Sequence, residues 1–192
     1  MIDYGSFCFA SPPRTATSWF KTVCLKADIL HDGRGASFIP SNARGERLSV
    51  SLVRHPYDWL SSFYHAWGHG SLFRSHTGYV EKVDKFTCLA NRTLTFTMFM
   101  DDYFSKMPGA VGEMFASYNS STVMRLEDLP WAVVEFFQSL GFNGSALNDV
   151  AQTPPLNESK KSRPFSKKPP KWLRSAVCEA ESEFCDLYDY RP

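Results

Sequence analysis

The hydrophobic and polar positions of the chain form short apolar runs separated by amphipathic stretches. Apolar residues dominate Ser6 to Ala10 and Leu48 to Val53, and a third run lies within "STVMRLEDL". Runs of this length, bounded by turn residues, are typical of buried strands. Between them, apolar residues recur at the helical period. Strands separated by helices predict an α/β fold with a mostly parallel sheet that helices cover on both faces, in three α/β/α layers.

Six segments carry the helical period or a helix-start signal. They are Thr17 to about Leu30, a helix opening at Pro56, Thr93 to Lys106, Val111 to Tyr118, Pro130 to Leu140 and Pro170 to Leu187. Proline suits the first turn of a helix, where its missing N–H would have no partner anyway. With 192 residues and 43% hydrophobic content, the chain is long enough for one core, so residues 1–192 are expected to form a single domain.

The charge and the cysteine content of the chain limit the classes of protein to which it can belong. Lysine and arginine total 21 against 20 acidic residues, a formal net charge of +1, which argues against a nucleic-acid or membrane-surface partner. Five scattered cysteines without a CxxC pair are expected to be reduced thiols. No apolar run has the length of a bilayer span and the chain enters a strand almost at once, so we expect no signal peptide and a cytoplasmic protein.

The stretch "FCFASPPRTATSWFKTV", Phe7 to Val23, passes from a strand through a hydroxyl-rich loop into a helix. Free backbone N–H groups and the helix dipole at such a helix start favour an anion, and side-chain hydroxyls add donors. The phosphate loop of nucleotide triphosphatases would need a lysine where this chain has Thr17. The sequence therefore predicts a cradle for one phosphate group beside Arg14, and an ATPase or GTPase is disfavoured.

The segment "PRTATSW", Pro13 to Trp19, resembles the P-K-S-G-T-T-W loop of sulfotransferases that use 3′-phosphoadenosine 5′-phosphosulfate. The resemblance implies a P-loop-NTPase-like fold and a cradle for the 5′-phosphosulfate. The residues that it assigns to the cofactor here are Arg14, Thr15, Ala16, Thr17, Ser18 and Trp19. Arg14 takes the lysine position and Trp19 the position whose ring packs on adenine. Ala16 replaces a glycine, and alanine is expected there only if the loop keeps φ negative.

A second segment, "VRHPYDWLSSFYHAW", resembles the 3′-phosphate motif of the same family. In that motif an arginine at a strand end and a serine eight residues later grip the phosphate, and these are Arg54 and Ser62 here. The spacing is physically reasonable, because a residue at the carboxyl end of a parallel strand and a hydroxyl two turns into the next helix can converge. "VMRLEDL" and "EAESEFCDLYDY" are weaker matches to later parts of the family, so the resemblance spans nearly the whole chain.

Sulfuryl transfer needs a positive group at the leaving phosphate and a base for the proton of the acceptor. Arg14 is the candidate for the first role. His31 is the candidate base because its unperturbed pKa suits proton transfer near neutrality, with Asp28, Asp32 and Glu46 as alternatives. The acidic pair Glu127 and Asp128 is interpreted as a cap of the following helix.

The remaining motifs define partners and alternatives. The basic run from Lys160 to Arg174 is either a solvated loop or a lid over the 3′-phosphate, through Lys160 and Lys161. His65 and His69 lack a placed carboxylate, so no metal is expected. The acceptor is expected to be a small molecule or a glycan, with its hydroxyl or amine as nucleophile. A catalytically silent nucleotide-binding module and a kinase-like phosphotransferase stay open as alternatives.

Overall fold

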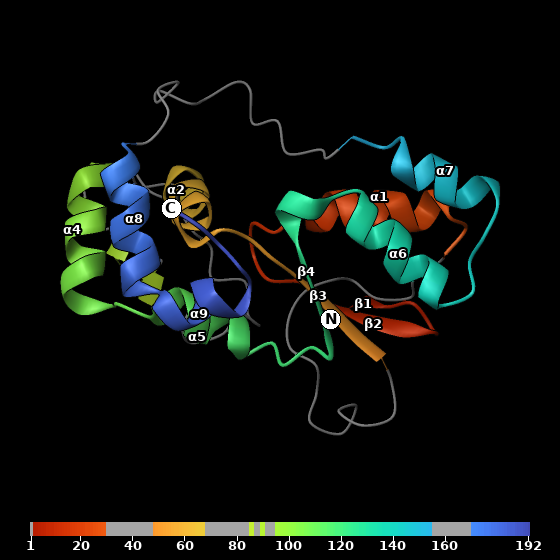
Figure 1. Cartoon of the computed structure of the whole chain (residues 1–192), viewed down its shortest axis with the longest axis horizontal. Coiled ribbons are helices and arrows are strands. Elements are labelled where there is room, and N and C mark those ends of the chain that lie inside the picture. The colour runs from red at the N-terminus through yellow and green to blue at the C-terminus, as the bar shows by residue number, and fades with distance from the viewer. Residues whose placement is uncertain (1, 30–47, 68–84, 87–88, 91–94, 155–169) are drawn as a thin grey trace. The chain divides into compact units, whose positions relative to one another are not determined.

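The computed structural model describes residues 2–29, 48–67, 85–86, 89–90, 95–154 and 170–192 of the chain (Figure 1). The chain divides into two compact units, each built from two segments. Unit 1 comprises Met1–Arg54 and Tyr118–Ser159, and unit 2 comprises His55–Ser117 and Lys160–Pro192. Each unit is described by itself, and the expectation of one domain over residues 1–192 stays a prediction.

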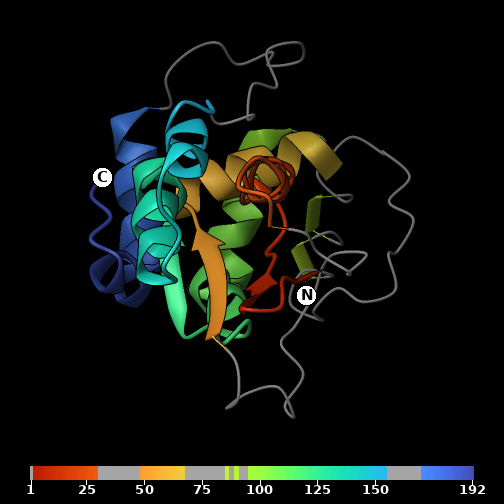
Figure 2. The same cartoon turned by 90° about the vertical axis from the view of Figure 1, so that its right-hand side faces the viewer.

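Unit 1 contains a sheet with the strand order β1-β2-β3-β4 among the described residues. The strands are β1 (Ile2–Asp3), β2 (Phe7–Ala10), β3 (Leu48–Val53) and β4 (Thr122–Arg125). β1 pairs antiparallel with β2, whereas β3 is parallel to both of its neighbours and lies between them (Figure 2). The predicted α/β class and mostly parallel sheet are therefore confirmed, and β1 is an addition.

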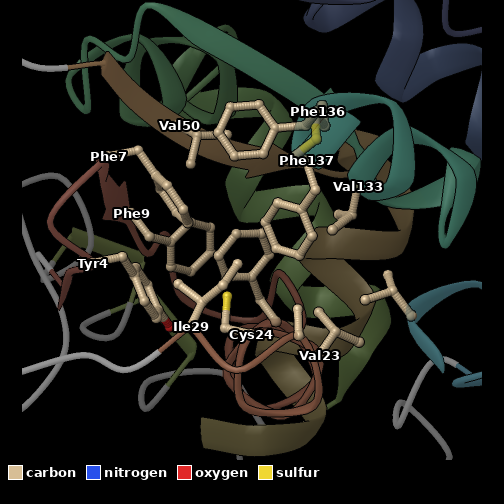
Figure 3. Packing of buried hydrophobic residues seen from close by; sticks show 14 of the residues in the cluster. Tyr4, Phe7, Phe9, Val23, Cys24, Ile29, Val50, Val133, Phe136 and Phe137 are labelled. Atoms are coloured by element: carbon tan, nitrogen blue, oxygen red, sulfur yellow. The ribbon is translucent and has the colours of Figure 1, made fainter. Parts of the chain in front are cut away.

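The helices of unit 1 pack on a core that is rich in phenylalanine. They are α1 (Thr17–Lys26), α6 (Trp131–Ser139) and α7 (Ser145–Ala151). Phe9 of β2 stacks on Phe20 of α1 with ring centroids 4.1 Å apart, and Phe7 meets Phe136 of α6 edge to face at 5.1 Å (Figure 3). Each of these buried rings contributes about 1.5 to 3 kcal/mol of transfer free energy. The cluster holds α1 and α6 over the sheet, whose strand β2 leads into the predicted cradle.

The serines of β3 show why a buried strand alternates apolar and polar residues. Val50 and Leu52 belong to the core cluster, and the serines that alternate with them, Ser49 and Ser51, are buried as well. Ser121, just before β4, donates its hydroxyl to the Ser49 carbonyl at 2.9 Å and accepts the Ser49 N–H at 3.0 Å. The Ser121 N–H in turn donates to the Ser49 hydroxyl at 2.8 Å. These bonds satisfy polar groups that burial would otherwise penalise, and they reinforce the β3–β4 pairing.

Unit 2 is helical over its described residues. Its helices are α2 (Pro56–Trp67), α4 (Phe96–Lys106), α5 (Ala110–Ala116), α8 (Lys171–Ala180) and α9 (Ser182–Leu187). α2 begins at Pro56 as predicted. α4 begins three residues later than predicted, because the Thr95 hydroxyl accepts the Met98 N–H at 3.2 Å and so caps the helix. No helix among the described residues is both long and apolar enough to cross a membrane.

A buried carboxylate separates α8 from α9, where the sequence predicted one continuous helix. Glu181 is only 2% exposed and has a non-helical backbone. Its Oε1 accepts the Val111 N–H at 2.9 Å and the Tyr103 hydroxyl, and its Oε2 accepts the Gly112 N–H at 2.7 Å. Glu181 therefore satisfies the second and third N–H groups of α5, an arrangement that only the tertiary contact creates.

Candidate functional site

The candidate site of unit 1 lies at the carboxyl edge of the sheet. β2, β3 and β4 run parallel, so the segments that follow them emerge at the same edge. Ala10, the last residue of β2, pairs with Ser51, and Val53, the last residue of β3, pairs with Arg125. The predicted cradle after β2 and the residue after β3, Arg54, are therefore carried by neighbouring strands.

The cradle loop is held by hydrogen bonds between its own residues. The Thr15 hydroxyl donates to the Pro12 carbonyl at 2.6 Å, and Thr15 is fully buried. The hydroxyls of Ser11 and Thr17 are hydrogen-bonded to each other. The predicted role of the Thr15 hydroxyl as a cofactor donor does not fit this arrangement, because its proton is already used inside the loop. Thr17 lies at the first turn of α1 and is partly exposed.

Ala16 adopts a left-handed backbone conformation, which glycine takes more readily than alanine. Its φ is 58° and its ψ is 30°, so the expectation that an alanine fits here only with a negative φ was wrong. A side chain in this region costs roughly 1–2 kcal/mol, which the closed loop and the burial of the Ala16 methyl group against the core offset. The loop thus holds an alanine in a conformation that suits glycine better.

The first turn of α1 presents N–H groups at the end of this loop. Among the described residues no side chain caps the helix, and its first backbone bond runs from the Phe20 N–H to the Ala16 carbonyl at 2.9 Å. The N–H groups of residues 17–19 precede that bond and lie at the positive end of the helix dipole. The Ser18 side chain is exposed beside them. This is the geometry that binds a phosphate or sulfate group.

Arg14 adds a positive charge to the loop. Its side chain is exposed, and its backbone is left-handed with φ 65°. The protein around it lowers the pKa of the Arg14 guanidinium through desolvation, although an arginine stays protonated at neutral pH. Guanidinium groups form two parallel hydrogen bonds with phosphate oxygens. Arg14 is therefore chemically suited to the leaving-group role that the sequence assigned to it.

Trp19 does not have the position that its predicted role requires. The ring is 1% exposed within the core of unit 1, and the indole N–H donates to the Thr153 carbonyl at 3.1 Å. Lys26 also binds Thr153, through the hydroxyl at 2.9 Å. The prediction that the Trp19 ring packs on adenine therefore does not fit the structure, because that ring is covered by protein. It instead fastens α1 to the end of α7.

The two predicted 3′-phosphate residues lie in different units. Arg54 is half-buried and directly follows β3 in unit 1. Ser62 is half-buried on α2, a helix of unit 2 that begins two residues after Arg54. Their convergence on one phosphate stays a prediction.

Several predicted residues lie outside the described part of the chain. These are the candidate base His31, the alternative bases Asp32 and Glu46, the basic residues Lys160 and Lys161, and His69. Asp28, another alternative base, is described and exposed just beyond the far end of α1. A helix of ten residues is about 15 Å long, so Asp28 is poorly placed to serve the cradle.

Asp128, of the acidic pair after β4, has a different role from the predicted one. Arg125, the last residue of β4, binds Asp128 through two hydrogen bonds of 2.7 and 2.8 Å. This interaction lowers the pKa of the Asp128 carboxyl. α6 begins after Pro130 without a side-chain cap, so the predicted capping role of the pair was wrong. The signal in the sequence for this ion pair was Arg125, which ends "VMR" and lies at the same sheet edge as Arg54.

Comparisons of the chain with protein-family models, with curated proteins and with solved structures gave no match. The resemblance to sulfotransferases therefore depends on the two sequence motifs. The arrangement of the described residues at the sheet edge is the physical argument that accompanies it. In that arrangement Arg14 lies just before the start of α1, where no side chain caps the helix, a combination that is suited to an anion.

Proposed function

We propose that the chain is a sulfotransferase that moves the sulfuryl group of 3′-phosphoadenosine 5′-phosphosulfate to a hydroxyl or amine. The observation that carries the proposal is the pairing of the two motifs on adjacent parallel strands. The loop after β2 and Arg54 after β3 emerge at the same sheet edge. In open α/β sheets this edge is where ligands bind. A P-loop-like, three-layer fold belongs to the same proposal.

The described residues fit the anionic part of this cofactor. The N–H groups at the start of α1, the Ser18 hydroxyl and Arg14 would hold the 5′-phosphosulfate. Arg54 and Ser62 would hold the 3′-phosphate, with Lys160 and Lys161 as additional cations. The adenine needs a surface other than the Trp19 ring, since that ring is buried. Ala16 and Thr15 would contribute only backbone groups.

The cofactor supplies an activated sulfuryl group whose bond to the 5′-phosphate breaks as the acceptor oxygen or nitrogen binds sulfur. Arg14 would stabilise the negative charge that develops on the departing phosphate, so that 3′,5′-adenosine bisphosphate leaves. A base must take the acceptor proton, and His31 stays our proposal for that role. No metal is required in this scheme, because arginine and helix N–H groups provide the positive charge.

The expected context is a cytoplasmic enzyme with a small-molecule or glycan acceptor and without a nucleic-acid or membrane partner. The near balance of 21 basic and 20 acidic residues supports the last two points. The kinase alternative is disfavoured, because Thr17 occupies the position of the lysine that reaches a triphosphate.

Isothermal titration with 3′,5′-adenosine bisphosphate, adenosine 5′-phosphate and ATP with Mg²⁺ tests the binding part of the proposal. The bisphosphate should bind about tenfold or more tighter than the monophosphate, because a second charged group is recognised. Preference for Mg²⁺-ATP would favour a kinase instead. Transfer of ³⁵S-labelled sulfate from the cofactor to a panel of phenols, amines and glycans tests catalysis. Tight bisphosphate binding without transfer to any acceptor would indicate the catalytically silent module.

A further inference from the structure

A groove between α6 and α7 of unit 1 has no role in the proposed reaction. The two helices pack against each other (Figure 1). Together with the turn that joins them, they line an open groove with a volume of about 380 Å³. Small-molecule sites are usually roughly 300 to 1,000 Å³ in volume. The groove therefore has the size of a ligand site.

The groove combines an apolar floor with an exposed indole. Val134 and Leu147 line it and are buried. Trp131, the first residue of α6, lines it as well, yet 63% of its surface is exposed. An indole is the largest apolar side chain and is usually mostly covered, so an exposed one beside a cavity offers a flat surface to a ligand.

The polar lining consists of carboxamides. Gln138, Asn143 and Asn148 line the groove and are exposed. Each carboxamide can both donate and accept hydrogen bonds. None of the described residues that line the groove is charged. A phosphorylated or carboxylated ligand would call for arginine or lysine, and a cationic one for carboxylates, so the lining favours a neutral ligand rich in hydroxyl groups.

We propose that this groove is a binding site for a neutral oligosaccharide. The C–H face of a sugar ring packs on the Trp131 indole, and the sugar hydroxyls exchange hydrogen bonds with the amides of Gln138, Asn143 and Asn148. An apolar peptide fits less well, because it would leave the three amides facing apolar atoms. The proposal concerns binding alone and does not rest on sulfuryl transfer.

Saturation-transfer NMR and isothermal titration of the full chain with maltose, cellobiose and lactose test the proposal. The protein is produced in bacteria, so that Asn143, which begins an Asn-Gly-Ser tripeptide, carries no glycan. At least one disaccharide should bind saturably with a dissociation constant of about 1 mM, the weak affinity expected of one open subsite. Trp131→Ala should weaken this binding by about tenfold or more, whereas Trp131→Phe should retain part of it.

Trp172 provides the matched control. It is 67% exposed on α8 of unit 2, so Trp172→Ala removes an equally exposed indole that does not line the groove. This variant should bind the disaccharide as the unchanged protein does, and circular dichroism should show that both variants are folded. The proposal is overturned if no disaccharide saturates the protein at about 50 mM, or if both alanine variants lose binding equally. It is also overturned if Trp131→Ala abolishes a self-association seen by sedimentation, which would make the groove a contact between copies.

Discussion

Glu181 allows the most detailed stability prediction, because the three groups that donate hydrogen bonds to it are buried or partly buried in unit 2. Glu181→Ala removes the acceptor for the N–H groups of Val111 and Gly112 and for the Tyr103 hydroxyl. Each buried donor left without a partner costs about 1–3 kcal/mol. The variant no longer has to bury a carboxylate, and this gain offsets part of that sum. We expect a net loss of about 2–4 kcal/mol in the free energy of unfolding.

Urea denaturation followed by circular dichroism measures this loss, with Glu179→Ala as the matched control. Glu179 lies two residues earlier on α8 and is exposed, so its removal should change stability by less than about 0.5 kcal/mol. Tyr103→Phe removes one donor and leaves the carboxylate in place, so it should cost less than Glu181→Ala. Equal stabilities for the Glu181 and Glu179 variants would refute the reasoning.

Glu181 should also make the free energy of unfolding depend on pH. Desolvation raises the pKa of the Glu181 carboxyl in the folded chain, and this effect exceeds that of the hydrogen bonds from Tyr103 and α5, which lower it. The folded state then holds the proton more tightly than the unfolded state does. The contribution of protonated Glu181 to stability is fully present below the pKa of this carboxyl in the unfolded chain, and it is lost as the pH rises through its pKa in the folded chain. Glu181→Gln should lack this component when unfolding is measured at a series of pH values from 4 to 8.

Three further predictions concern the candidate site. Arg54→Ala should weaken binding of 3′,5′-adenosine bisphosphate by about 1.5–3 kcal/mol and leave adenosine 5′-phosphate nearly unaffected, whereas equal losses in titration would remove Arg54 from the 3′-phosphate site. Arg14→Ala should lower turnover by about tenfold or more while cofactor affinity changes much less, and normal turnover at saturating cofactor would exclude its mechanistic role. Ala16→Gly should change the free energy of unfolding by less than about 1 kcal/mol, because relief of the backbone strain at φ 58° offsets the lost methyl contact and the greater entropy of the unfolded chain. A loss above about 2 kcal/mol in urea denaturation would show that Ala16 is not strained.

Local signals in the sequence were sufficient to predict most of the helices and strands. The bounds of β3 and the start of α2 at Pro56 agree with the prediction, because a short apolar run and the preference of proline for a first helical turn depend only on neighbouring residues. β1 was missed, since two residues are too few to carry a periodic pattern. The alternation of strands and helices also predicted parallel pairing, which β2, β3 and β4 adopt.

The sequence by itself determined that a hydroxyl-rich loop with Arg14 follows a strand and leads into a helix. Only the tertiary structure decided which of its groups face outward. Trp19 is covered because its indole binds Thr153, which lies 134 residues further along the chain, and Glu181 breaks a helix because it binds the start of α5 from a distance of 70 residues. The backbone of Ala16 likewise follows from the closed loop around it. Periodicity and turn preferences are local properties, whereas burial and hydrogen-bond partners depend on residues that folding brings together.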